Sequence, residues 1–335
     1  MPTTVGSGIG SSLGLAKETT FGTWVTPTKW AEFESETLEW KPKRIVGVGL
    51  ANGNIVQRNS TRQTTTSTVE GDVKVPFYYK GMGLFLGSIM GTLGTTPTQQ
   101  GATAAYLQTH GLTASTTGQS ISIQKGVPST NGTINQYNYW GLKATKAVFE
   151  AAADQFIECT FTFDGKGYDQ TNAYATPTYQ TPNPIFAFNQ AQFKIGAYGS
   201  EVVVEGIRKW TLTVERPLKT DNFYLDGTGL KQEQVGSGFV AITLDLESDY
   251  ISDAAFVAQF TADTAQSMIL QATGPVIATS YNNQATFAVP NMRWVSGPPM
   301  IAGPDIIQPK LQLVGLYDDT HTPLTISYMS TDTTL

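Results

Sequence analysis

Asp245, Glu247 and Asp249 occupy every second position of one short segment. On a β-strand this spacing places all three carboxylates on the same face. Grouped carboxylates can bind calcium or supply the acid and base of a glycosidase. More often they form a solvated acidic surface, which repels phosphate groups. Each of these interpretations requires a strand over the segment.

Other residues that could do chemistry lack the spacing that chemistry needs. His110 and His321 are the only histidines and Cys159 is the only cysteine, which disfavours a zinc site and excludes a disulfide within the chain. The glycine-rich start has Leu13 where a dinucleotide fingerprint requires glycine. Ser11 lies in a Gly-x-Ser-x-Gly sequence without the strand-to-helix turn of a nucleophile elbow. We therefore expect no cofactor, no metal and no catalysis.

A polar segment, 43–68, is basic in a chain whose net charge is −6. Its Asn-Gly pair favours a tight hairpin turn, so we expect a long projecting hairpin or loop. Contact with nucleic acid is one interpretation, and contact with an acidic neighbouring protein is the other. The candidate contact residues are Lys41, Lys43, Arg44, Asn52, Gly53, Arg58 and Arg62.

Composition limits the classes of protein that need to be considered. The 335 residues are enough for about two domains. Charged residues make up 14%, against about 25% in an average soluble domain, so the surface must be mostly uncharged and polar. Such a surface suits a protein that neighbours cover. The sequence shows no targeting signal and no apolar run near the ~18 residues of a membrane helix, so we expect synthesis in a cytoplasm.

Two blocks of sequence recur, which indicates a duplication. Gly71–Tyr78 and Gly238–Asp245 alternate in the same way, and each is followed by a short apolar stretch suited to a helix. Thr160–Gly165 similarly matches Lys310–Gly315. Many short strands with one modest helix per half predict an all-β chain of two tandem β-sandwich domains.

The breaks in this pattern divide the chain. A Gly/Thr/Ser-rich start has little apolar content, and a Pro-rich stretch separates the two copies. We expect an N-terminal arm at 1–30, a first domain at 31–168 containing the loop 43–68, a linker at 169–184 and a second domain at 185–335, with helices near 81–92 and 252–262.

The opening residues carry a family resemblance. Leu15-Ala16-Lys17-Glu18-Thr19 is followed by Thr20-Phe21-Gly22-Thr23, a polar linker and the first expected strand of the first domain. This stretch resembles the start of tail tube proteins (major tail proteins) of long-tailed, non-contractile bacteriophages, and the strand–helix order of 69–92 resembles the same family. The resemblance covers most of the chain, although the second half depends mainly on the internal repeat.

The resemblance implies a structural virion protein rather than an enzyme. In that family six sandwich domains form a ring around a central β-barrel, and rings stack into a tube that conducts DNA during ejection. Two domains per chain imply a trimeric ring with pseudo-sixfold symmetry. The partners implied are other copies of the chain, a tape-measure protein, tail terminator and distal tail proteins, and double-stranded DNA in transit without specific binding. Segment 43–68 would contact an adjacent ring, and Asp245, Glu247 and Asp249 would form an acidic channel face.

Two alternatives from other classes stay open. A β-sandwich on a virion or cell surface could bind carbohydrate or act as an adhesin, although the six tryptophans are scattered along the sequence. A hydrolase could use the carboxylates of Asp245 and Glu247. Hollow tubes in the electron microscope, glycan affinity of a monomer, or turnover lost in Asp245→Ala would separate the three hypotheses.

Overall fold

Antiparallel β-strands make up nearly all of the regular secondary structure. The computed structural model describes residues 5–335 except 52, 251–256, 297–300, 302 and 305. Its first-half elements are β1 Ser12–Lys17, β2 Lys29–Ala31, β3 Ser35–Glu36, β4 Glu39–Val46, η1 Asn59–Thr61, β5 Arg62–Pro76, α1 Gly83–Met90, β6 Thr98–Gln99, β7 Tyr106–Gly111, β8 Ile121–Pro128, β9 Ile134–Ala152, β10 Glu158–Gly165 and β11 Gly167–Asp169.

The second half repeats this composition of short strands and one small helix. Its elements are η2 Phe188–Gln190, β12 Ala191–Gly196, β13 Val202–Val203, β14 Ile207–Glu215, β15 Leu218–Lys219, β16 Val235–Gly236, β17 Ala241–Ser248, α2 Val257–Thr261, β18 Gln266–Ala278, β19 Tyr281–Trp294, β20 Lys310–Gly315 and β21 Thr325–Ser330. The expected helix 252–262 therefore lies partly outside the described residues. Among the described residues, no helix has the length and apolar content needed to cross a membrane.

Strand pairing in the first half follows an order that the second half repeats. In the first half β4 pairs with β5, β5 with β10, β10 with β9, and β9 with β8 and β11. In the second half β14 pairs with β17, β17 with β20, β20 with β19, and β19 with β18 and β21. The outer strands also correspond, because β1 pairs with β8 and β12 with β18.

The pairing corrects one alignment made from the sequence. Phe161 of β10 lies opposite Val73, and the matching Leu311 of β20 lies opposite Leu246. The sequence alignment instead matched Val73 with Val240, six residues earlier. A period of two makes strands shifted by an even number of residues look alike, so only the hydrogen-bonded partner sets the correct register.

The two halves join edge to edge. β9 continues past its pairing with β8, and its C-terminal part pairs with β14 from Lys146↔Glu215 to Ala152↔Lys209. β21 likewise pairs with β7 of the first half. In the single chain the described strands leave this array open instead of closing it into a barrel.

Both halves also share one hydrophobic core. The Phe77 ring, fully buried on β5's extension, contacts the rings of Phe186, Phe287 and Tyr328, with centroids about 6 Å apart. Burying such rings stabilises a fold by roughly 1.5–3 kcal/mol each. The core therefore ties the first half to the second.

Helix α1 is short because glycine ends it. All of its residues are buried, and Gly91 follows with φ of +83°, the left-handed conformation that stops a helix. Gly87 allows close approach of the chain, since a Cβ there would lie 2.6 Å from the Leu93 Cα. The expected helix 81–92 is thus confirmed in position and is two residues shorter at each end.

Some expected loops are strands in the structure. Residues 12–17, inside the expected N-terminal arm, form β1 with Leu13 and Leu15 buried against β8. The sequence signal is weak there because glycine and serine surround only two large apolar residues. The C-terminal strand β21 lies between β19 and β7, so it is not at an edge of the sheet.

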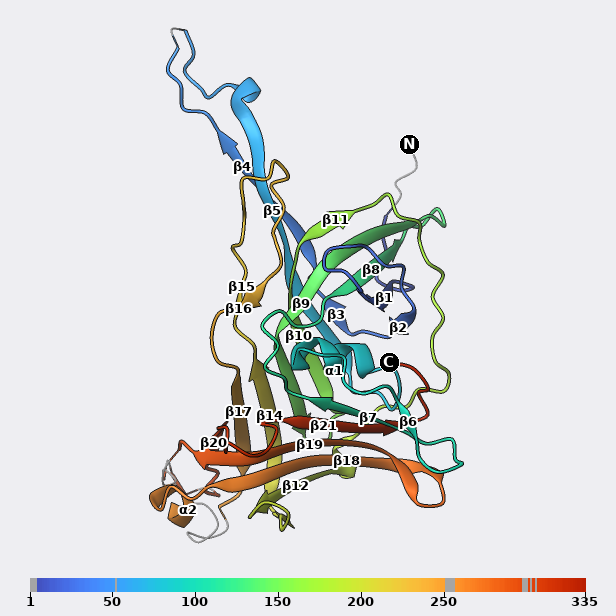
Figure 1. Ribbon diagram of the computed structural model, residues 1–335, viewed down its shortest axis with the longest axis vertical. Coiled ribbons are helices and arrows are strands. Elements are labelled where there is room, and N and C mark those ends of the chain that lie inside the picture. The colour runs from blue at the N-terminus through green and yellow to red at the C-terminus, as the bar shows by residue number, and fades with distance from the viewer. Residues whose placement is uncertain (1–4, 52, 251–256, 297–300, 302, 305) are drawn as a thin grey trace.

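The hairpin formed by β4 and β5 projects far from the rest of the molecule, along its longest axis (Figure 1). The connection between β14 and β17 rises beside it, and β15 and β16 lie within that connection (Figure 1). We call residues 217–236 the strap. The strands β18, β19 and β21 lie at the opposite end of the molecule.

Candidate assembly surfaces

A broad polar face covers one side of the joined sheet. Strands β5, β10, β9, β14, β17 and β20 alternate buried apolar residues with accessible Thr, Lys, Glu, Asp and Gln. On β14, for example, Trp210, Leu212 and Val214 are buried, whereas Thr211 and Thr213 are partly exposed. Because the strands pair edge to edge in one order, their polar residues form one continuous surface.

Cross-strand ion pairs neutralise much of this face. The Lys74 ammonium lies 2.8 Å from Glu34 and 2.6 Å from Glu158, and these contacts raise the pKa of Lys74 to about 12. Exposed pairs of this kind contribute at most about 1 kcal/mol each. Their main effect is a surface with little uncompensated charge. The other pairs are Lys209 with Glu150, Lys146 with Glu215, and Lys310 with Glu247.

The three predicted acidic residues occupy two environments. Asp245 and Glu247 both lie on β17 and are exposed on the polar face, where Gln312 Nε2 donates to Asp245. Asp249 lies just beyond the end of β17 and accepts two hydrogen bonds from Arg208, at 2.9 and 3.1 Å. These hydrogen bonds from Arg208 are the main reason why the pKa of Asp249 is lowered.

The predicted basic residues all lie on the projecting hairpin. Lys41, Lys43 and Arg44 belong to β4, Arg58 precedes η1, and Arg62 begins β5. Gly53 has φ of +83°, as expected for a turn at the tip, while Asn52 lies outside the described residues. The expected hairpin is therefore present. Its two strands include both ends of the segment 43–68, so that only the middle of this segment is a loop.

The hairpin is basic throughout and apolar at its tip. Residues 40–69 contain five Lys and Arg and no Asp or Glu. Several large apolar side chains near the tip are exposed, namely Ile45, Val48, Leu50, Ile55 and Val56. A soluble monomer rarely exposes such a group together, and one that does usually has an interaction site there.

The strap was missed as a functional element by sequence reasoning. Lys231 is buried and its ammonium forms an ion pair with Asp164 of β10 and a 2.7 Å hydrogen bond to Thr68 of β5. Gln234 Nε2 also donates to Asp164, and burial raises the pKa of the Asp164 carboxyl. A second buried lysine, Lys143, reaches the strap from β9. The strap is thus fixed to the first half by charged groups within the protein.

The Glu18 side chain gives the opening motif its structural role. Its buried carboxylate accepts hydrogen bonds from the main chain of Gly22 at 2.9 Å and Gly141 at 2.7 Å, and from Ser122 Oγ at 2.9 Å. Burial raises the pKa of Glu18. The Phe21 ring, held by this turn, lies under the Lys143 ammonium at 4.9 Å. The resemblance marked these residues, but only the structure shows what they contact.

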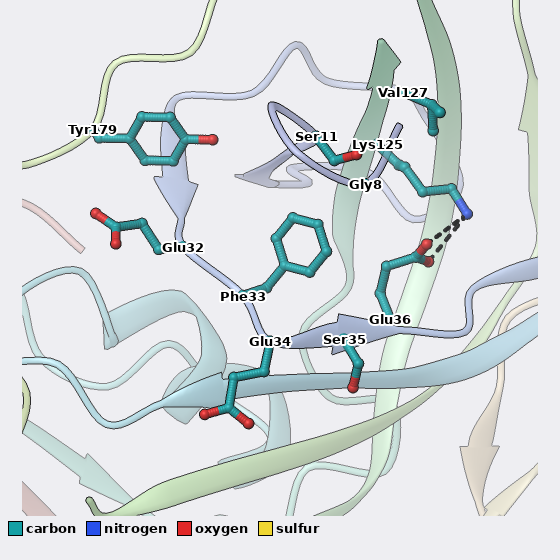
Figure 2. Close-up of a pocket in the computed structure, with 10 residues that line it drawn as sticks. All are labelled: Gly8, Ser11, Glu32, Phe33, Glu34, Ser35, Glu36, Lys125, Val127 and Tyr179. Atoms are coloured by element: carbon teal, nitrogen blue, oxygen red, sulfur yellow. Dashed lines mark hydrogen bonds and ion pairs between the residues drawn. The ribbon is translucent and has the colours of Figure 1, made fainter. Parts of the chain in front are cut away.

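One cavity lies beside β3 and holds several charged groups. Figure 2 shows Glu32, Glu34 and Glu36 with Lys125 and Tyr179 along its wall. The Lys125 ammonium lies 2.9 and 3.1 Å from the two Glu36 oxygens. The charge of Lys125 therefore serves to hold β3 to β8. We assign these charged groups a structural role rather than a role in binding a ligand.

The histidines are far from a catalytic arrangement. His110 is buried, and burial lowers its pKa to about 4. His321 Nδ1 lies 2.7 Å from the Oδ2 atom of Asp318, which is three residues earlier in the chain. Among the residues that the structure describes, no group of three His, Cys, Asp or Glu side chains is placed to hold a metal ion.

A comparison with protein families extends this description. A family model described as phage tail tube protein matches residues 8–327. The matched segment runs from just before β1 into β21, so it includes the polar face, the hairpin and the strap. The comparison with curated proteins gave no match.

Proposed function

Because the chain belongs to the phage tail tube protein family, we propose that it polymerises into stacked rings that form the tail tube of a long-tailed, non-contractile phage. Membership of this family means that the chain is a structural protein of the virion and assembles with copies of itself into a tube. In the proposed tube the rings enclose a channel that conducts genomic DNA at ejection.

The pairing of β9 with β14 carries this proposal. It joins two four-strand arrays, β4–β5–β10–β9 and β14–β17–β20–β19, with seven paired positions. Between the halves, the last strand of one array meets the first strand of the next. A contact of this head-to-tail kind repeats from copy to copy until it closes a ring or forms a filament.

The first strand of the first array is available for that contact. Among the described residues, β4 pairs with β5 alone, so its other edge presents main-chain donors and acceptors to solvent. Pro42 and the charges of Lys41 and Lys43 interrupt this edge and discourage indiscriminate pairing. Three chains with two arrays each give the proposed trimeric ring of pseudo-sixfold symmetry, with repeat units at 31–168 and 185–335 joined through 169–184.

The polar face is the proposed channel wall, with Asp245, Glu247 and Asp249 on it or at its margin. Paired charges and threonines keep such a wall hydrated without a strong field, so DNA would slide past without specific binding. The same channel would hold a tape-measure protein before ejection. Tail terminator and distal tail proteins would meet the two ends of the tube.

The hairpin is the proposed contact with a neighbouring copy. Its candidate contact residues are those predicted from the sequence, namely Lys41, Lys43, Arg44, Asn52, Gly53, Arg58 and Arg62. The rest of the chain is acidic, which provides a complementary surface.

One observation favours the alternative of a carbohydrate-binding module. Trp40, Tyr137, Tyr139 and Tyr168 line one pocket. However, the Trp40 and Tyr168 rings stack on each other with centroids 5.6 Å apart. Lys125 lies over two of the other rings, so little ring surface is left for a sugar.

Electron microscopy of the purified full-length protein tests the proposal. We expect rings or hollow tubes of uniform width, and a sedimenting unit with the mass of three 36.1 kDa chains or a multiple of it. A monomer at every concentration, together with binding to a glycan array, would support the alternative and contradict the tube.

A further inference from the structure

An apolar groove lies beside the start of β17, where the second half meets the segment that follows β7. Its volume is about 800 Å³, and its walls come from the segment after β7, from β17 and from the chain that follows β20. Phe239, Leu316 and Tyr317 line it and are at least half exposed in the single chain. Apolar surface of this extent on a soluble protein usually contacts a partner.

The corresponding place in the first half is covered. Counting along the paired strands from Leu246 and Val73, the groove residues Val240 and Ile242 correspond to Ser67 and Val69 of β5. There the strap lies across β5, because Ser67 N donates to the Gly229 carbonyl at 3.2 Å. Lys231 and Gln234 of the strap then close over β10, as described above.

The strap has a counterpart in the first half, and that counterpart points away from its own chain. The strap connects β14 to β17, and the hairpin tip connects the equivalent strands β4 and β5. Whereas the strap lies along the body of the molecule, the hairpin extends beyond it (Figure 1). Among the residues that the structure describes, the groove therefore lacks the cover that its equivalent has.

Given the tube proposed above, we propose that the β4–β5 hairpin of a second copy covers this groove. Ile55 and Val56 of this hairpin are exposed and lie in the segment that leads into β5. The residues near Gly229 lie in the same way in the part of the strap that leads into β17. In the proposed contact, Ile55 and Val56 pack against Leu316 and Tyr317. Burying two such side chains removes apolar surface from water on both partners.

Charge complementarity supports the same occupant. Residues 40–69 of the hairpin carry five of the 21 Lys and Arg and no Asp or Glu, so the rest of the chain has 16 basic residues against 27 acidic ones. Asp318 and Asp319 follow directly after Tyr317 at the rim of the groove. A second copy's Arg58, three residues after Ile55, can approach this rim.

A buried oxygen beside the groove also lacks a partner. Asn291 accepts a hydrogen bond from Leu316 N through its main chain, at 2.9 Å. Its side-chain Oδ1 is buried without a partner among the described residues. The equivalent position in the first half is Gly141, whose carbonyl accepts from Gln234 of the strap. A donor from the covering hairpin would supply a partner for the side-chain oxygen of Asn291, at the position whose first-half equivalent the strap reaches through a main-chain carbonyl.

Disulfide trapping between two variants, each with one introduced cysteine, tests the inference. The native Cys159 is fully buried, so it does not interfere. Full-length Ile55→Cys protein is mixed with Leu316→Cys protein under assembly conditions and oxidised. Because a disulfide needs Cβ atoms about 4 Å apart, we expect a covalent dimer at twice the monomer mass. The matched control replaces Leu316→Cys with Val276→Cys, an exposed valine on β18, and is expected to give no dimer.

The other outcomes are distinguishable. Rings or tubes without the Ile55–Leu316 dimer, or with equal trapping at position 276, would overturn the groove inference and leave the tube intact. Both substitutions placed in one chain report on self-contact, and a disulfide that leaves the mass unchanged would mean that the hairpin folds onto its own groove. A chain that stays monomeric would overturn both proposals.

Discussion

At the scale of single residues, Glu18 determines how the start of the chain is held. We expect Glu18→Gln to lower the free energy of unfolding by about 1–3 kcal/mol, because an amide nitrogen would face the Gly22 or Gly141 N–H that now donates to a carboxylate oxygen. Urea denaturation of dilute protein measures this. Lys17→Gln, at the exposed neighbouring position, is the control, and equal stability of both variants would refute the role of Glu18.

His110 provides a pH prediction at the same scale. Its pKa is lowered from 6.5 to about 4 by burial, so the unfolded chain binds more protons than the folded one between these values. Stability is therefore present above pH 6.5 and is lost as the pH falls towards 4, by about 3 kcal/mol from this group. Denaturation of wild type and His110→Gln at pH 7 and pH 4.5 isolates the effect from that of the carboxylates. The prediction fails if both proteins lose the same amount.

At the scale of elements, the strap depends on a buried ion pair. We expect Lys231→Met to leave the Asp164 carboxylate buried without its cation and to cost about 3–5 kcal/mol. Adding Asp164→Leu removes the stranded charge and should recover part of the loss. Lys41→Met, which breaks an exposed pair with Glu70, should cost less than about 1 kcal/mol. Limited proteolysis within 217–236 and urea denaturation report the result.

The hairpin is the second element with a separable role. Replacing residues 48–57 with a two-residue Asn-Gly turn retains the pairing of Val46 with Arg62 and the core. We expect an unchanged thermal transition but no growth of tubes, because the exposed tip no longer reaches a neighbour. Electron microscopy and differential scanning calorimetry test the two parts, and tubes of normal length would show that the tip is dispensable.

At the scale of the whole molecule, the strand-pairing order of the first half recurs in the second, and this supports the proposal that one chain supplies two units of the ring. In the proposed ring, the edge of β4 that no described strand covers would repeat between chains the β9–β14 contact made inside the chain. A shared core across both halves fixes their relative position, so the angle between successive units is set before assembly. A rigid angle favours a closed ring of defined size over an irregular filament.

The sequence by itself determined the all-β class, the helix in the first half and the basic hairpin, and it indicated a repeat, although it aligned one of the two repeated blocks incorrectly. These follow from local signals such as the alternation along Gly71–Tyr78 and the Asn-Gly turn, which need no knowledge of distant contacts. The family followed from the short stretch around Glu18. The absence of Asp and Glu from residues 40–69 is also a property of the sequence alone.

Only the tertiary structure decided how distant segments meet. The register of β17 against β20, the joining of β9 to β14 and the burial of Lys231 against Asp164 depend on residues far apart in the chain. An even shift leaves an alternating strand equally amphipathic, and a lysine in a polar loop has the same local sequence whether it is solvated or buried. Hydrogen-bonded partners and shared burial, which exist only in the folded chain, therefore placed the groove and showed that no described segment of the chain covers it.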